Sequence, residues 1–330
     1  MTLIKFNYKN LDLEPYYFFG LEEYILNNLT NNNPDSYFFT WKIKGIVVGK
    51  YQVLEREINT KFVIDNSIKV FRRPTGGGAV YADNNNTMFS IISPLSETFS
   101  FQKELSKIVD YFKTINLNLE VSERNDILLD NQKISGNAFL KTKNGFLLHG
   151  TLLYDLDRNM MINCLNPSKD KYISKGIQSI SKRITNLKEH TSINENDLVD
   201  GLRDFLCQDS CYTLSSEEEK IVVSLSKKYK TKKFVYHNDP LYTITYDSRF
   251  KFGNLIFSFL VEKRVIKDLN INGDFFVIDK FDEFKNSFKG VLFTKLEMIK
   301  NINKFNVSEI FLGSTNLELE EFINTFDILE

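Results

Sequence analysis

The sequence predicts an α+β fold with a large domain followed by a small one. Apolar residues recur at helical spacing in several segments, and the segments that read as strands follow one another in runs between them. A length of 330 residues is sufficient for both domains. We place the boundary after a basic run at 227–233, which divides the chain into 1–240 and 241–330.

The first expected elements are a helix and a set of strands. Pro15 precedes a segment at 16–28 with apolar residues near helical spacing, and proline is tolerated at a helix start because that amide has no partner within the helix. Strands are expected at 36–41, 46–48, 68–71 and 87–93. The turn at Lys44-Gly45 indicates that the first two strands form a hairpin.

The middle of the chain predicts a helix followed by three strands. Apolar residues at 101, 105, 108, 109 and 112 have the spacing of an amphipathic helix. Strands are expected at 127–129, 133–138 and 146–153. Asp130-Asn131 has the residue types of a hairpin turn, which puts Lys133 on or beside a strand. A strand holds a side chain rigidly, as a catalytic cation requires.

Helices are expected on both sides of the domain boundary. Before it, Ser192-x-x-Glu195 and Ser216-x-x-Glu219 have the spacing of a capping box ahead of apolar runs. After it, strands are expected around residues 256 and 265, and helices at 295–303 and 317–326. These later elements predict a small α+β domain.

Composition restricts the classes of function. A formal net charge of −1 provides no basic surface for phosphate-backbone binding, so no nucleic-acid partner is expected. Cys207 and Cys211 are four residues apart on an expected helix, but without a second pair nearby they indicate two reduced thiols rather than a metal site. The N-terminus has no signal-peptide core, and no segment approaches the ~18 apolar residues that span a bilayer. We therefore expect a soluble, cytoplasmic protein without a membrane partner.

Three consecutive glycines after two arginines form the most informative motif, Arg72-Arg73-Pro74-Thr75-Gly76-Gly77-Gly78. Glycine lets the backbone approach a ligand closely and adopt positive φ. Bare amides can then point at an anion while guanidinium groups neutralise it. Lys133, within Lys-Ile-Ser-Gly-Asn-Ala, fits a cation at a reacting centre. The pattern predicts a phosphate or carboxylate site, and a flexible turn with surface arginines is the alternative.

Several ordered blocks extend this motif along the chain. They lie at 37–41, 47–52, 57–59, 72–80, 124–126, 133–136, 149–153, 174–187 and 249–253. Through these blocks the chain resembles the lipoate–protein ligases, in the superfamily that also holds biotin protein ligases and lipoyl or octanoyl transferases. The resemblance implies a class II aminoacyl-tRNA synthetase-like catalytic domain with a mixed central sheet. It also implies a small α+β C-terminal accessory domain.

The resemblance further implies a reaction, in which ATP and Mg²⁺ are used to join (R)-lipoate to a specific lysine of a lipoyl carrier domain through lipoyl-AMP. ATP is needed because a carboxylate is a poor electrophile until it is adenylated. Adenylation brings two anions into contact, so cations must offset their repulsion in a partly dry site. Lys133 matches the motif lysine that bridges the lipoate carboxyl and the α-phosphate, and it is the implied catalytic residue.

The resemblance also implies the residues that contact each substrate. The implied lipoate contacts are Arg73, Thr75, Gly76, Gly77, Gly78 and His149. The implied ATP or adenylate contacts are Arg72, Val80, Tyr81, Asn125, Asp126, Lys133, Ala138, Thr151, Lys175 and Gly176, with Asp126 as the Mg²⁺ ligand. The loop at 174–187 is implied to close over the adenylate and exclude water. For His149 a structural role and a general-base role both stay open.

Some positions depart from the commonest wording of the family. Pro74 stiffens the glycine loop because its φ is restricted. Ala82 replaces a frequent His, Ser181 a frequent Arg, and Val53 a frequent Asn. These departures leave the motif lysine and the glycines in place, but they bear on substrate range and adenylate affinity.

Three other functions stay open at this point. An ATP-independent lipoyl or octanoyl transferase would need a cysteine nucleophile, and no base is obvious beside Cys164. A biotin ligase would carry Gly-Arg-Gly-Arg-x-Gly-Arg in place of the triple-glycine motif. A non-catalytic binding protein is disfavoured by the retained motif residues. The acceptor is expected to be a 2-oxoacid dehydrogenase E2 subunit, the glycine-cleavage H protein, or both.

Overall fold

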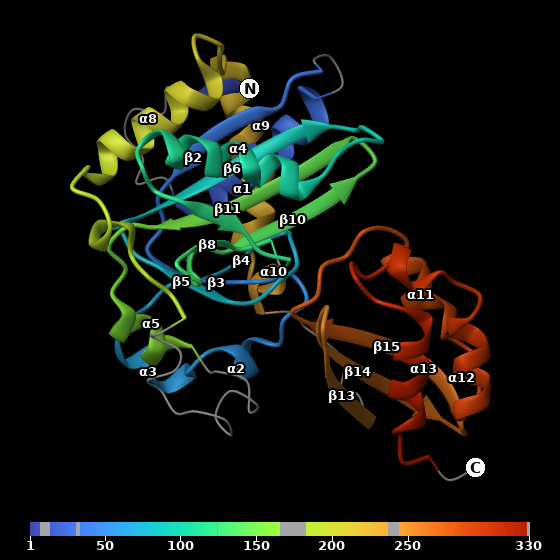
Figure 1. The fold of residues 1–330 in the computed structure, drawn as a ribbon. Coiled ribbons are helices and arrows are strands. Elements are labelled where there is room, and N and C mark those ends of the chain that lie inside the picture. The colour runs from blue at the N-terminus through green and yellow to red at the C-terminus, as the bar shows by residue number, and fades with distance from the viewer. Residues whose placement is uncertain (7–13, 31–33, 124, 166–182, 237–243, 329–330) are drawn as a thin grey trace.

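A six-stranded mixed sheet organises the first domain of the computed structural model (Figure 1). The structure describes residues 1–330 except 7–13, 31–33, 124, 166–182, 237–243 and 329–330. In spatial order the strands are β10 (Asn137–Thr142), β11 (Gly145–Leu153), β6 (Asn86–Pro94), β2 (Tyr37–Trp41), β1 (Thr2–Lys5) and β12 (Cys211–Thr213). Neighbours from β10 to β2 are antiparallel, whereas β2, β1 and β12 are parallel. The predicted α+β class with a mixed central sheet is confirmed.

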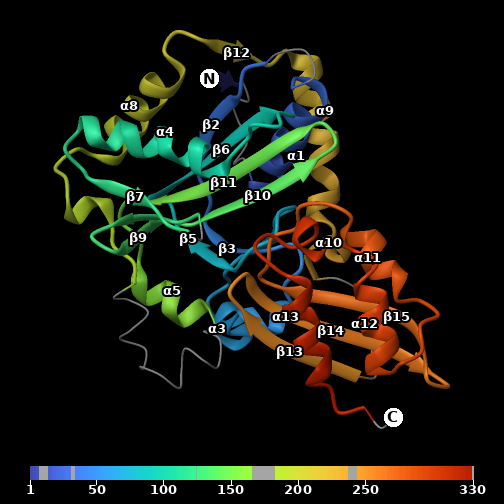
Figure 2. The same ribbon diagram turned by 45° about the vertical axis from the view of Figure 1, so that its right-hand side comes forward.

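Helices cover both faces of this sheet (Figure 2). On one face lies α1 (Pro15–Asn28), backed by α9 (Ser216–Ser226), and on the other lie α4 (Phe101–Thr114) and α8 (Glu195–Cys207). Side chains of β2 alternate accordingly, with Phe39 and Trp41 packed in the α1 core and Phe38 in the α4 core. Because both faces are covered, every residue of β11 is buried.

The residues at the N-termini of four helices show how these helices begin. Pro15 lies in the first turn of α1, and the hydroxyl of Ser100 accepts from the Lys103 amide at the start of α4, so both predicted helices are confirmed. The capping residues predicted for the next two helices are wrong. The cap of α8 is Asn194, and the capping box of α9 is formed by Ser215 and Glu218, one residue earlier than expected.

Two three-stranded sheets adjoin the central one. The first is ordered β4 (Val70–Arg72), β3 (Gly45–Val48), β5 (Val80–Ala82), and the second β7 (Leu119–Val121), β8 (Ile127–Leu129), β9 (Gln132–Ser135). The β8–β9 hairpin is confirmed, since Asp130 and Asn131 adopt φ of 51° and 63°. Lys133 therefore lies on β9, where its backbone pairs with the segment 183–185.

Two other sequence predictions are wrong. Residues 36–41 and 46–48 do not form a hairpin, because β2 pairs with β6 and β1 while β3 belongs to a separate sheet. All five residues of β2 are buried, and β6 already occupies the neighbouring position, so the chain leaves the sheet after Trp41. Cys207 and Cys211 do not share a helix, because α8 ends at Cys207 and β12 begins at Cys211.

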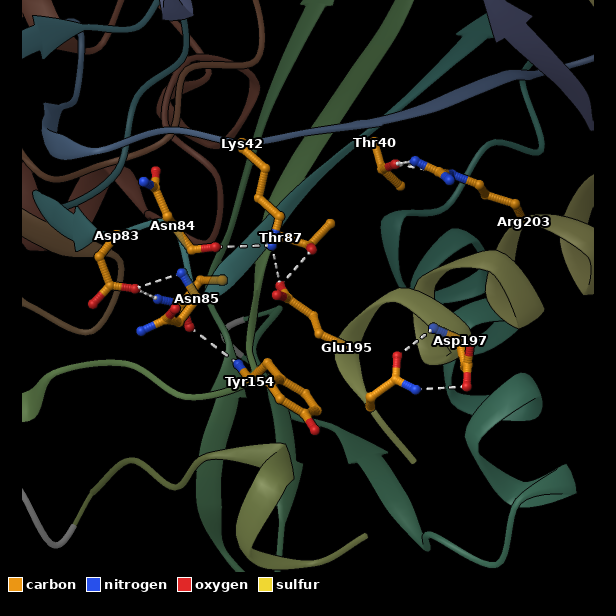
Figure 3. A network of polar contacts seen from close by, with 12 residues as sticks. Thr40, Lys42, Asp83, Asn84, Asn85, Thr87, Tyr154, Glu195, Asp197 and Arg203 are labelled. Atoms are coloured by element: carbon orange, nitrogen blue, oxygen red, sulfur yellow. Dashed lines mark hydrogen bonds and ion pairs between the residues drawn. The ribbon is translucent and has the colours of Figure 1, made fainter. Parts of the chain in front are cut away.

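Polar contacts attach α8 to the central sheet (Figure 3). The Lys42 ammonium, just after β2, pairs with the Glu195 carboxylate and donates to the Asn84 carbonyl at 3.1 Å. Thr87 of β6 donates to the same carboxylate at 2.7 Å. The Arg203 guanidinium donates to Thr40 at 3.0 Å. These contacts reach the start and the middle of α8 and explain its fixed position on β2 and β6.

Short helices complete the first domain. They are α2 (Leu54–Glu57), α3 (Thr60–Asp65), α5 (Arg158–Cys164), η1 (Leu187–Glu189), η2 (Lys227–Lys230) and α10 (Lys232–Tyr236). No helix of the described residues is both long enough and apolar enough to cross a membrane.

The second domain is a small α+β unit with its own core. An antiparallel sheet of β13 (Ile244–Phe250), β14 (Gly253–Glu262) and β15 (Val265–Gly273) packs against α11 (Phe281–Ser287), α12 (Lys295–Ile302), η3 (Val307–Glu309) and α13 (Asn316–Asn324). Many edge-to-face phenylalanine pairs fill this core. The predicted boundary at residue 240 lies in 237–243, outside the described residues, and stays a prediction.

The two domains meet at the glycine loop, residues 73–78. The Gly77 amide donates to the Phe275 carbonyl at 3.2 Å, and the Gly273 amide donates to the Tyr51 carbonyl at 2.8 Å. The ring of Phe275 stacks on that of Tyr51 at 5.3 Å. Phe276 stacks on Phe139 of β10 at 4.7 Å. The C-terminal domain therefore contacts both the glycine loop and the edge of the central sheet.

Candidate functional site

A pocket opens between β11, the glycine loop and β9. Sheet register orders its lining, because Trp41 of β2 pairs with Met88 of β6, Met88 pairs with Thr151 of β11, and the Gly136 amide next to β9 donates to Thr151. Trp41 and Met88 thus form an apolar end, and Lys133 on β9 forms a cationic end. The lining residues are Phe19, Trp41, Val47, Arg73, Gly78, Ala79, Val80, Met88, Lys133, Gly136, Asn137, Ala138, His149, Gly150 and Thr151. Seven of the predicted site residues are among them: Arg73, Gly78, Val80, Lys133, Ala138, His149 and Thr151. The structure thus brings Lys133 and the glycine loop to one cavity.

Lys133 supplies the cationic end of the pocket. Its ammonium lies 2.9 Å from the Asp126 carboxylate, and both side chains are partly exposed, at 35% and 25%. A Cβ placed on Gly136 would lie 2.8 Å from Cε and Nζ of Lys133. Glycine at position 136, three residues after Lys133, therefore leaves room for the lysine side chain in this conformation.

Arg73 holds the glycine loop from the inside. Its guanidinium donates to the Gly76 carbonyl at 2.7 Å and to the Gly78 carbonyl at 2.8 Å, and it also reaches the Val47 carbonyl at 3.2 Å. Burial lowers the pKa of Arg73 to about 9, with a further decrease from neighbouring Arg72. The side chain therefore remains a cation at neutral pH while most of its donors are used to shape the loop.

The three glycines of the loop have different neighbours. A Cβ added at Gly76 would lie 2.4 Å from the Phe275 carbonyl oxygen, and one at Gly77 would lie 2.8 Å from the Phe276 ring. Gly77 also has a φ of +85°, which disfavours any other residue. At Gly78, an added Cβ would meet no heavy atom of the described residues within 4 Å, its chain neighbours aside. Only Gly78 of the three lines the pocket; Gly76 and Gly77 accommodate the C-terminal domain.

Arg72 does not reach the pocket. Its side chain is 1% exposed, and its guanidinium donates to the carbonyls of Gly49, Gln52 and Val235 at 2.7–2.8 Å. These donors are committed to the backbone of neighbouring segments, and the expected contact with ATP stays a prediction. Arg72 thus supports the loop structure around the site.

His149 belongs to a buried chain of hydrogen bonds behind the pocket wall. Its Nε2 lies 2.8 Å from the Thr75 hydroxyl, and its Nδ1 lies 2.8 Å from the Glu22 carboxylate. Arg73 donates to the same threonine hydroxyl at 3.0 Å. Thr75 is fully buried and does not line the pocket, so its contact with the site passes through His149 and Arg73.

The remaining predicted residues are distributed around this centre. Asn125 is buried with a φ of 60°, and its carbonyl accepts from the Asn137 side chain at 2.7 Å. Tyr81 packs in a core cluster next to the pocket and does not line it. Lys175 and Gly176 lie outside the described residues, together with most of the loop predicted to close over the adenylate.

The sequence analysis missed the apolar end of the pocket as a functional surface. Phe19, Trp41, Val47 and Met88 line it, and each belongs to a segment that otherwise reads as ordinary core. One residue in the sequence, Glu22, could have indicated a functional site at this part of the pocket. Glu22 is a carboxylate on the buried face of α1, and an acidic residue at such a position is rarely buried without a partner.

The described residues suit a magnesium ion that binds together with a nucleotide and takes few ligands from the protein. They contain no group of three acidic, histidine or cysteine side chains that could hold a metal by themselves. Mg²⁺ bound with a nucleotide usually takes one or two carboxylates, several waters and phosphate oxygens. The Asp126 carboxylate beside Lys133 suits that role.

Comparisons with known proteins agree with this site. Residues 14–206 match the profile of the lipoyl protein ligase A/B catalytic domain, and residues 239–326 match that of the bacterial lipoate protein ligase C-terminus. The chain is 33% identical over 300 residues to lipoate–protein ligase 1 of Staphylococcus aureus, covering 88% of this chain and 90% of that protein. It is 30% identical over 320 residues to the lipoate-protein ligase LplJ of Bacillus subtilis, covering 92% and 94%.

A solved structure extends the similarity to the whole fold. The crystal structure of P. falciparum LipL1 in complex with lipoate aligns with a TM-score of 0.80 and 26% identity over 98% of each chain. The sequence matches, the shared fold and the pocket agree. The chain therefore belongs to the lipoate–protein ligase family, enzymes that join lipoate to protein in an ATP-dependent reaction.

Proposed function

We propose that the pocket between β9, β11 and the glycine loop activates lipoate and transfers it to a lysine of a lipoyl carrier domain. One observation carries the assignment: a single pocket is lined by the ammonium-bearing side chain of Lys133 on β9 and by the apolar side chains of Phe19, Trp41 and Met88, with Thr151 of β11 between β9 and Met88 of β6. The apolar end suits an acyl chain with its dithiolane ring. The cationic end suits a carboxylate.

The reaction has two steps with complementary electrostatic demands. First, a lipoate carboxylate oxygen attacks the α-phosphorus of ATP, and pyrophosphate leaves. Then the acceptor lysine amine attacks the acyl carbon and loses a proton, and AMP leaves with the electron pair of the broken C–O bond. Negative charge accumulates on oxygens beside the reacting atom in both steps. A fixed ammonium therefore stabilises both transition states.

Lys133 is the residue that we assign to this role. Its placement on β9 fixes the backbone from which the side chain extends, and Gly136 leaves space for that side chain. Asp126 pairs with it at 2.9 Å. A phosphate entering the site would compete for the same ammonium.

The nucleotide is assigned to the rim formed by Val80, Ala138 and Thr151, next to Asn125 and Asp126. Lys175 and Gly176 are retained in this group on the resemblance alone. Magnesium would be held by Asp126 and the phosphates, where it would offset charge on the triphosphate. Arg72 and Tyr81 are assigned to support of the site.

The acceptor is assigned to lipoyl domains of 2-oxoacid dehydrogenase E2 subunits, the glycine-cleavage H protein, or both. This class of acceptor rests on the resemblance alone. Its lysine must reach the acyl carbon near Lys133, so the mouth of the pocket is the surface that the acceptor covers.

The activity assay that tests this proposal combines the purified protein, lipoate and each apo acceptor, with and without ATP and Mg²⁺. Mass spectrometry of the acceptor should show a lipoyl adduct only when ATP is present. Lys133→Ala should abolish the adduct, whereas Lys141→Ala, which removes an exposed lysine of β10, should not. An adduct that forms from a lipoylated donor without ATP would identify a transferase. A biotin adduct, or none from any donor, would refute the assignment.

A further inference from the structure

Glu22 is a buried carboxylate that no step of the reaction uses. It lies on α1 and is 0% exposed. Its Oε1 accepts from Ser90 at 2.6 Å and lies 2.8 Å from Nδ1 of His149, whereas Oε2 has no hydrogen-bond partner among the described residues. A buried carboxylate with one unpaired oxygen is unfavourable for stability. Its presence points to a function that depends on it.

One assignment of donors and acceptors satisfies every side chain between the glycine loop and Glu22. Arg73 can only donate, so the Thr75 hydroxyl accepts from it. The hydroxyl keeps its own proton, which it can donate to Nε2 of His149. A neutral imidazole that accepts at Nε2 carries its proton on Nδ1 and donates it to Glu22. A carboxylate at this position favours a proton on Nδ1 and so links Glu22 to Thr75 through the imidazole.

This series of hydrogen bonds ends at Arg73, which contacts the wall of the pocket. The guanidinium that donates to Thr75 also donates to the carbonyls of Gly76 and Gly78. Gly78 faces the cavity. Arg73 and Glu22 attract each other, so the buried cation and the buried anion compensate through the two side chains between them. Loss of Glu22 would leave the charge of Arg73 uncompensated and the loop less firmly held.

A second branch runs from Glu22 to the apolar end of the pocket. Ser90 donates to Glu22, so its oxygen is free to accept from Nε1 of Trp41 at 3.1 Å. The Trp41 indole lines the pocket and stacks on Phe18 at 4.9 Å. All atoms of this branch are buried. One carboxylate is thus linked by hydrogen bonds to two parts of the pocket lining, Gly78 and Trp41.

We propose that Glu22 is a positioning residue for lipoate: it orients the glycine loop through His149, Thr75 and Arg73, and the Trp41 indole through Ser90. This inference rests on the assignment of the pocket to lipoate. It concerns binding of the acyl substrate and not the bond-making steps, because Glu22 touches neither Lys133 nor the expected position of the phosphates.

The test exploits the fact that Trp41 is the one tryptophan of the 330 residues. Tryptophan emission therefore reports on the apolar end of the pocket alone. In Glu22→Gln the emission of the free protein should shift, and lipoate titrated against that emission should bind about 10-fold more weakly, as expected for loss of a charged hydrogen-bond partner. The KM for ATP and the kcat at saturating lipoate should change much less.

Matched variants separate positioning from folding. Thr75→Val removes the hydroxyl at nearly constant volume and should weaken lipoate binding, whereas Thr75→Ser should restore it. Ser90→Ala should shift the Trp41 emission in the same way as Glu22→Gln. Glu104→Gln, which breaks the pair of a partly buried carboxylate with Lys107 on α4, should leave lipoate binding unchanged. Circular dichroism and thermal unfolding establish that each variant is folded.

The outcomes distinguish failure of the positioning role of Glu22 from failure of the lipoate assignment. If folded Glu22→Gln binds lipoate as the unmodified protein does, with unchanged Trp41 emission, the positioning role is refuted while the lipoate assignment stands. If Glu22 and Thr75 substitutions weaken binding additively, they do not act through one chain of hydrogen bonds, and the inference also fails. If the unmodified protein itself binds no lipoate, the proposed function is refuted instead.

Discussion

The Lys133 ammonium lies 2.9 Å from the Asp126 carboxylate, across the hairpin of β8 and β9. The pair joins the residue assigned to both chemical steps with the residue assigned to the metal. Within the protein the carboxylate compensates the lysine charge. Bound phosphates would offer the ammonium a second anion and the carboxylate a cation, so substrate binding should rearrange this contact.

Lys133→Ala should reduce the rate of adenylate formation by about 10²–10³-fold, because removal of one charge-stabilising contact in a partly dry site has an effect of that size. Pyrophosphate release with lipoate and ATP, without an acceptor, measures this step directly. The thermal unfolding temperature should change little, since the ammonium is partly exposed. Near-normal pyrophosphate release from the variant would exclude Lys133 from the chemistry.

Asp126→Asn should raise the Mg²⁺ concentration needed for half-maximal activity, because an amide is a weaker ligand for a hard cation than a carboxylate. A magnesium titration at fixed ATP measures the change. If that titration is unaltered and only the kcat falls, Asp126 acts by orienting Lys133 and does not hold the metal.

Gly78→Val should raise the KM for lipoate more than the KM for ATP. The added side chain enters space that the described protein atoms leave open, so the fold should tolerate it while the ligand does not. Initial rates at varied lipoate and varied ATP measure the two constants. A larger rise for ATP would mean that the two ends of the pocket have been assigned in reverse.

Gly77→Val should behave differently from its neighbour. A side chain at a φ of +85° is strained and would collide with the Phe276 ring at 2.8 Å, so the variant should be less stable and should hold the C-terminal domain less firmly. Thermal unfolding and limited proteolysis measure these effects. Unchanged stability together with a selective loss of lipoate binding would place Gly77, and not only Gly78, at the ligand.

Arg72→Met should destabilise the fold by about 2–5 kcal/mol, because it leaves several buried carbonyls without a donor. Those of Gln52 and Val235 are the clearest. Denaturant unfolding measures the loss. For protein that remains folded, the KM for ATP should be nearly unchanged. A selective rise in that constant without loss of stability would restore Arg72 to the nucleotide site.

Local chemistry in the chain was sufficient to predict the elements that carry Lys133. Asp130 and Asn131 adopt the positive φ that their residue types favour, so the hairpin and the position of the lysine on β9 follow from a few neighbouring residues. The helices at α1 and α4 were predicted for the same reason, since a spaced apolar face and a residue that permits the first turn are both local. The glycine loop was also visible as a motif.

Partners of these elements could not be predicted in the same way. The segment after β2 carries a turn signal, yet β3 pairs elsewhere, because burial of both faces of β2 places β6 beside it. Likewise, nothing near Gly76 or Gly77 indicates that these residues make room for Phe275 and Phe276, nearly two hundred residues later.

The functional network behind the pocket depends most on tertiary structure. Glu22 and His149 are 127 residues apart in the chain, and only the packing of α1 on β11 brings the carboxylate to the imidazole. Residue types and spacing identify a lysine and a glycine loop, because each works through its own local backbone. A chain of hydrogen bonds through buried side chains requires several distant elements to pack in one arrangement, and that arrangement is determined by which apolar faces are buried together.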